Sequence, residues 1–153
     1  MTEQQRIVDQ LDRAYREPAW YGPALLTLLK GVTPAQAAKR PIPTAHTIWE
    51  LVRHIIVWIK IPRERIETHT GMDPETVAEW EPIPEFTAAA WEAMLAELEQ
   101  ELELLKKTFL KMSDAQLNEP VPGKDFSYYV VMQGVVQHMA YHAGQIALLK
   151  KMN

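Results

Sequence analysis

An unbroken apolar stripe with helical spacing runs through residues 91–112, and it constrains the fold more than any other feature of the chain. Its members are all apolar: Trp91, Leu95, Leu98, Leu102, Leu105, Phe109 and Met112. Intervals of four and three residues place such side chains on one face of a helix, and the charged residues of this segment lie off that face. The stripe therefore predicts a long helix that buries this face in a bundle.

Three further helical regions are predicted, and no segment shows the sustained alternation of a β-strand. The first covers about residues 2–29, and Pro18 and Pro23 interrupt it, so we expect two pieces or a bent helix. The last begins near Asp125 or Ser127. Short helical turns are also expected at residues 33–36, 73–75 and 113–116. Four main helices with medium connections predict an all-α fold, a four-helix bundle.

The remaining long helix is expected over about residues 47–70. Thr47 and Glu50 fit a capping box, in which each side chain binds the other residue's backbone amide. Gly71 is the expected C-cap. Pro62 lies inside the segment and implies a kink or a break, because proline cannot donate a helical hydrogen bond.

Composition and charge exclude several classes of function. With 153 residues, a single domain covering residues 1–153 is expected. The 16 basic and 20 acidic residues give a net charge of −4 without a basic stripe, so no nucleic-acid partner is expected. No apolar run approaches the ~18 residues of a membrane span, and the polar N-terminus does not resemble a signal peptide, so the cytoplasm is the expected compartment. The absence of cysteine excludes disulfides, thiolate zinc sites and a cysteine nucleophile.

Two histidines of the last helix, His138 and His142, lie four residues apart. Residues at this spacing share one helix face, so both imidazoles can reach the same ion. They stand in a stripe of packed-helix spacing that reads Val131, Val135, His138, His142, Gln145 and Leu149. Three consecutive polar positions in a packed stripe require partners. A metal ion is one candidate partner, and hydrogen bonds within the core are the other.

A second apolar stripe lies beside the first on the same helix. Its members are Met132, Val136, Met139, Ala143 and Ile146. A helix that is apolar on two adjacent faces is more deeply buried than a surface helix. The second stripe therefore either packs further into the bundle or faces another subunit.

A third ligand is needed for a typical catalytic metal site, which has three protein ligands and one open position. His54 is the best candidate, because it lies mid-helix in a segment that otherwise packs. His46 lies eight residues earlier, roughly 12 Å away if the helix extends that far, so the two cannot then bind one ion directly. His69 lies near a helix end, where exposure is expected.

Other residues near these histidines have a structural and a functional interpretation. Glu50 is foremost the capping acid, although a contact with His54 four residues later would also suit it. Gln145 either orients a ligand or bonds a neighbouring backbone group. Gly144 is expected to permit close helix approach, and a surface salt bridge is expected for Arg53. The tryptophans and methionines are expected in the core.

Three segments, residues 20–26, 46–55 and 137–146, together resemble the DinB-like superfamily in their order and spacing. The similarity runs from about residue 7 to residue 150 and so covers nearly the whole chain. It implies an up-down-down-up four-helix bundle. It also implies that a divalent metal, zinc or nickel, is bound by one histidine of the second helix and two of the last, which here are His54, His138 and His142.

The resemblance also bears on activity and partners. Relatives include transferases and isomerases that use low-molecular-weight thiols such as bacillithiol and mycothiol, and many are homodimers. We therefore expect a metal-dependent thiol transferase or hydrolase that acts on a small molecule, with His46, Glu50 and Gln145 near the metal or the substrate. The chain has no cysteine, so a thiol must arrive as a cosubstrate. The alternatives are a non-catalytic metal-binding or stress-response module and a purely structural, dimerising bundle.

Overall fold

The computed structural model describes residues 1–16, 19–71 and 80–152, and the regular secondary structure of these residues is helical, with no strand among them. The helices are α1 (Glu3–Tyr15), α2 (Leu25–Leu29), α3 (Pro34–Ala38), α4 (Ile48–Thr68), α5 (Ala88–Leu110), α6 (Asp114–Asn118) and α7 (Tyr128–Lys151). The all-α prediction is confirmed, as is the division of the first helical region into α1 and α2. Helices α3 and α6 confirm two of the short turns, and the turn expected at residues 73–75 lies outside the described residues.

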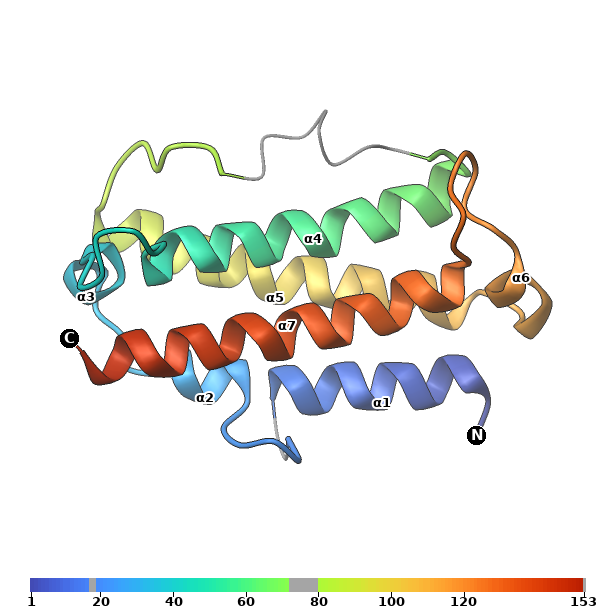
Figure 1. Cartoon of the computed structure of the whole chain (residues 1–153), viewed down its shortest axis with the longest axis horizontal. Coiled ribbons are helices and arrows are strands. Elements are labelled where there is room, and N and C mark those ends of the chain that lie inside the picture. The colour runs from blue at the N-terminus through green and yellow to red at the C-terminus, as the bar shows by residue number, and fades with distance from the viewer. Residues whose placement is uncertain (17–18, 72–79, 153) are drawn as a thin grey trace.

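The long helices α1, α4, α5 and α7 lie side by side, and the core lies between them (Figure 1). Helix α4 packs against α5 and α7, while α1 packs against α7 and α5. Helices α1 and α7 run in one direction, and α4 and α5 run in the other (Figure 1). Among the helices of the described ranges, none is long and apolar enough to cross a membrane.

Helix α5 carries the apolar stripe from which its position was predicted. Leu98, Leu102, Leu105 and Phe109 are fully buried, and Leu95 is partly buried. Burying a large aliphatic or aromatic side chain stabilises a fold by about 1.5–3 kcal/mol, so this stripe is a major contributor to the core. The prediction of a long bundle helix is confirmed.

Helix α4 begins at the predicted capping box. The Glu50 amide donates to Thr47 Oγ1 at 3.1 Å, and the Thr47 amide donates to Glu50 Oε2 at 2.7 Å. The helix continues through Pro62, so no break occurs there. Pro62 is buried together with its neighbour Ile61, and this packing holds the segment helical despite the missing donor.

The predicted C-cap of α4 is wrong. The helix ends at Thr68, and its C-cap, two residues before Gly71, is His69, which takes the left-handed conformation with φ 51° and ψ 41°. Gly71 has a different role, because a Cβ atom there would lie 1.9 Å from the carbonyl oxygen of Pro122. The glycine permits the segment after α4 to pass directly against the loop before α7.

Both stripes of α7 face the interior of the chain. Met132, Met139, Ala143 and Ile146 of the second stripe are buried at 0–1% exposure, and Val136 is partly buried. The second stripe therefore packs into the bundle. It is not available as a subunit interface.

Candidate metal centre

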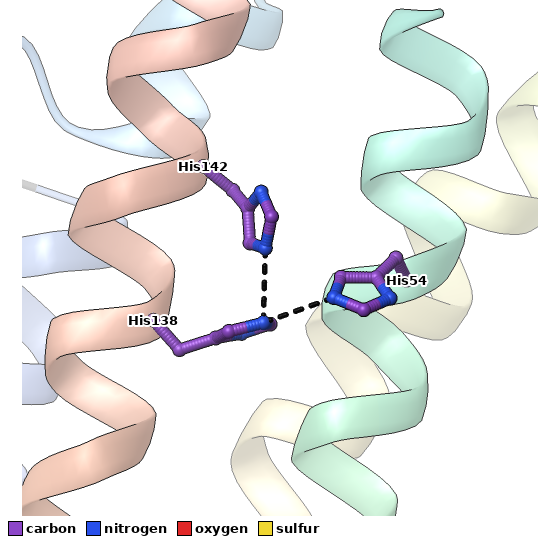
Figure 2. A group of neighbouring side chains, drawn as sticks. All are labelled: His54, His138 and His142. Atoms are coloured by element: carbon purple, nitrogen blue, oxygen red, sulfur yellow. Dashed lines mark hydrogen bonds between the residues drawn. The ribbon is translucent and has the colours of Figure 1, made fainter. Parts of the chain in front are cut away.

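The candidate centre lies between α4 and α7 (Figure 2). His54 projects from the middle of α4, and His138 and His142 project from successive turns of α7. His54 and His142 are each 5% exposed, and His138 is partly buried. The packing of α4 on α7 thus brings together three imidazoles from positions 84 residues apart in the sequence.

The three imidazole rings approach one another through their Nε2 atoms. His138 Nε2 lies 3.0 Å from His54 Nε2 and 2.9 Å from His142 Nε2. The candidate ligand atoms all lie within 4.8 Å of one another. Zinc–nitrogen bonds of ~2.0–2.1 Å in a tetrahedral site place ligand nitrogens about 3.3 Å apart. Small outward movements of the rings would therefore admit an ion, and the three histidines could hold one.

The two hydrogen bonds between the rings cannot both form at once. His142 Nδ1 lies 2.6 Å from Gln145 Oε1, and because an amide oxygen only accepts, Nδ1 carries the ring proton and donates. The Nε2 atom of neutral His142 therefore presents a lone pair to His138. A proton on His138 Nε2 cannot point at both His54 and His142, and without that proton two lone pairs face each other. A cation among the three nitrogens satisfies all of them at once.

The electrostatic environment keeps His138 and His142 neutral. Burial, together with the neighbouring His142 and His54, lowers the pKa of His138 to about 3. Burial also lowers the pKa of His142. The hydrogen bond to Gln145 opposes this shift, and the nearby His46 adds a smaller lowering contribution. Neutral imidazole is the form that binds a metal. At neutral pH, His138 and His142 can therefore bind an ion without first losing a proton.

An aromatic layer surrounds the three histidines. The Trp80 ring stacks on His54 with centroids 4.0 Å apart and an angle of 8° between the planes. The ring centroid of Trp58 lies 5.5 Å from that of His138, and the ring centroid of Tyr141 lies 5.0 Å from that of His142. The expectation that the tryptophans are core residues is wrong for Trp80, which is 40% exposed, and for Trp20, which is fully exposed.

Sequence reasoning missed these aromatic residues, although a signal existed for two of them. Trp58 follows His54 by four residues and so shares its helix face, and Tyr141 directly precedes His142. Trp80 lies in the connection between α4 and α5, where no periodicity identifies it. An ion pair between Arg53 of α4 and the adjacent Glu81 ties this connection to the helix, so the expected salt bridge of Arg53 is present.

His46 lies near the centre but behind Trp80. Its ring stacks on Trp80 with centroids 3.5 Å apart, so the indole separates His46 from His54. The capping residue Thr47 starts α4 after His46, which therefore lies outside the helix. His69, at the other end of α4, is exposed.

Glu50 acts as a capping acid. Its carboxylate accepts from the Thr47 amide and from Arg40 at 2.6 Å, and it lies 3.5 Å from His46 Nδ1. Partial burial raises the pKa of Glu50, but the hydrogen bonds from Thr47 and Arg40 outweigh it and lower the pKa below its usual value. Glu50 is thus an ionised carboxylate at the rim of the centre.

Gly144 does not have the role expected of it. It is exposed, and a Cβ atom there would have no neighbour within 4 Å. Among the described residues, no atom would contact an alanine side chain at this position. Gln145, the next residue, makes the contact with His142 described above.

Comparison with known proteins places the chain in a family. The family model of the DinB superfamily matches residues 22–146, which is more than half of the chain and includes all three histidines. The chain has no match among curated proteins and none among solved structures. On the family match, the chain belongs to the DinB superfamily.

Proposed function

We propose that His54, His138 and His142 bind a divalent metal ion, zinc or nickel, and that the protein is a metal-dependent thiol transferase or hydrolase. The observation that carries the proposal is the convergence of three imidazole Nε2 atoms from two helices, His138 Nε2 lying 3.0 Å and 2.9 Å from the other two. Three neutral ligands leave one position of a tetrahedral site open. A divalent ion held there would lower the pKa of a thiol or water that reaches it.

The surrounding residues have definable roles in such a site. Gln145 holds His142 in the tautomer that presents Nε2 to the ion. Trp80 covers one face of His54, and Trp58 lies beside His138, so both limit access of bulk water. Because the chain contains no cysteine, a thiol substrate would be an external, low-molecular-weight molecule.

Elemental analysis of protein purified without a polyhistidine tag tests metal binding. The wild type should contain about one zinc or nickel ion per chain, and His138→Ala and His142→Ala should each lose it. His69→Asn is the matched control, because His69 is exposed and asparagine tolerates its left-handed backbone. Stoichiometric metal in both alanine variants would contradict the proposal.

A non-catalytic metal-binding or stress-response module is the second candidate. It is favoured by the burial of His54 and His142 between two long helices, where an ion would also support the bundle. In that case chelation should lower the thermal stability while no thiol or electrophile is turned over. Assays of the metal-loaded protein with several low-molecular-weight thiols distinguish the two candidates.

We further propose an up-down-down-up bundle formed by one domain and a homodimeric assembly. The directions of α1, α4, α5 and α7 support the topology, and a core shared from Ile7 to Leu149 supports one domain. Because the second stripe of α7 is buried, a dimer would use the outer face of that helix, where Val130, Tyr141 and Leu148 are 52–64% exposed. Light scattering of the full chain measures the assembly directly.

A further inference from the structure

A cavity of about 240 Å³ between α4 and α7 reaches the histidine cluster. Its wall includes His138, and Trp58 lies beside that ring at 5.5 Å. A second cavity nearby is lined by His46 and Gln145, but its wall includes none of the three converging histidines. The first cavity is therefore the one from which a bound molecule would meet an ion at the centre.

The chemistry of the wall is apolar. Phe126 and Val131 are typical lining residues, and Arg65 is the one residue with a permanent charge among the described residues of the wall. The Arg65 side chain is buried, and its guanidinium lies 5.9 Å from the centre of the Phe126 ring. A wall of this kind favours an apolar molecule and disfavours a cation.

The volume limits the size of the occupant. Drug-sized ligands occupy pockets of ≈ 300–1,000 Å³, whereas an apolar cavity of about 150 Å³ accepts benzene. The cavity beside His138 lies between these values, at about 240 Å³. It suits a molecule with one aromatic ring or a short aliphatic chain.

Gly134 lines the cavity and is the position from which its volume can be changed. A glycine inside a helix is less favourable than alanine by roughly 0.5–1 kcal/mol. Neither packing nor backbone conformation requires this glycine, because a Cβ atom there would have no neighbour within 4 Å and its φ is not positive. Gly134 does line the cavity, so any larger side chain at this position would take up space in it.

We propose that this cavity binds the electrophilic substrate of the metal centre, a small uncharged molecule with one aromatic ring or a short apolar chain. Its apolar part lies against Trp58 and Phe126, and its reactive end lies at His138. The assignment of this molecule as a substrate rests on the proposed function, whereas its binding in the cavity does not.

Binding is tested with the full-length, zinc-loaded protein and fluorobenzene, followed by ¹⁹F NMR. The wild type should bind fluorobenzene, and Gly134→Leu should bind it at least about tenfold more weakly while its metal content and thermal stability are retained. Gly144→Leu is the matched control, because Gly144 is an exposed glycine of the same helix outside the cavity wall. Equal binding by wild type and Gly134→Leu, or no binding by the wild type, would overturn the proposal.

Replacement of zinc by paramagnetic cobalt(II) tests whether the cavity adjoins the centre. The ¹⁹F line of bound fluorobenzene should broaden in the cobalt protein relative to the zinc protein, and equal line widths would overturn the link to His138. The proposed metal site and the proposed binding cavity can be refuted independently of each other. A protein that binds no metal but loses fluorobenzene in Gly134→Leu refutes the metal site and supports the cavity, whereas a metal-binding protein that does not bind fluorobenzene does the reverse.

Discussion

Acid should destabilise the metal-free protein, and His138 should account for a defined part of the loss. The pKa of His138 in the folded chain is about 3, below the ordinary value of 6.5. The unfolded chain therefore binds a proton at this residue more readily than the folded chain does. The contribution of neutral His138 to stability is complete above about pH 6.5 and is lost as the pH falls from there towards 3.

The size of the effect follows from these two pKa values. Each pH unit below 6.5 lowers the free energy of unfolding by about 1.4 kcal/mol until the folded-state pKa is reached. Between about pH 7.5 and about pH 5 the loss from His138 is then at most about 2 kcal/mol. The observed value should be somewhat smaller, because His138 is only partly buried and water screens its charge.

Urea unfolding in the presence of a chelator measures this loss. His138→Gln is the matched variant, since glutamine is polar but does not titrate. His142 also has a lowered pKa and remains in both proteins, so the comparison removes its own titration and keeps its coupling to His138. The stability lost on acidification should be smaller in His138→Gln by up to about 2 kcal/mol. An equal loss in the two proteins would refute the assignment of a neutral His138 with a lowered pKa.

Three further substitutions probe the surroundings of the centre and the fold. Gln145→Leu removes the acceptor for His142 Nδ1 and should weaken metal affinity by about 10–100-fold in a competition titration with a chelating dye, and an unchanged affinity would contradict this role. Trp80→Ala removes a stacking partner of His54, worth about 0.5–1.5 kcal/mol, and should speed metal extraction by a chelator by roughly twofold to tenfold, whereas an unchanged rate would show that Trp80 does not cover the site. Gly71→Ala forces a Cβ atom against the Pro122 carbonyl and should lower the free energy of unfolding by about 1–3 kcal/mol in thermal or urea denaturation, a loss that an equally stable variant would disprove.

Features that depend on neighbours in the sequence were predictable. The α5 stripe from Trp91 to Met112 reports its own helix, because side chains three and four residues apart share a face whatever surrounds them. The capping box of Thr47 and Glu50 is equally local. The first turn of α4 could therefore be placed to the residue.

Features set by the packing of distant segments were not predictable from these patterns. Gly71 looks like a helix C-cap in the sequence. The close approach of the Pro122 carbonyl, far along the chain, is the reason that this position must be glycine. Gly144 looks like a close-packing glycine but has no neighbour there. The helix packing that decides both cases leaves no periodic signal around either residue.

The candidate centre combines both situations. The spacing of His138 and His142 is a local signal, and the place of His54 in the middle of a packed helix made it the best third candidate. That His54 lies opposite the other two histidines follows from the packing of α4 on α7. Trp80 reaches the centre from a connection without periodicity, so its stacking on His54 could not be read from the sequence.

The positions of the three histidines also bear on how the chain would unfold. His54 and His138 are separated by 84 residues, and the chain has no disulfide to restrain so long a loop. An ion bound by both helices would act as a reversible cross-link between α4 and α7, closing that loop in the way a disulfide does. An ion at about 1,000 times its dissociation constant would stabilise the folded state by about 4 kcal/mol if the unfolded chain did not bind it. Metal supply would then set the lifetime of the folded protein as well as the chemistry of its centre.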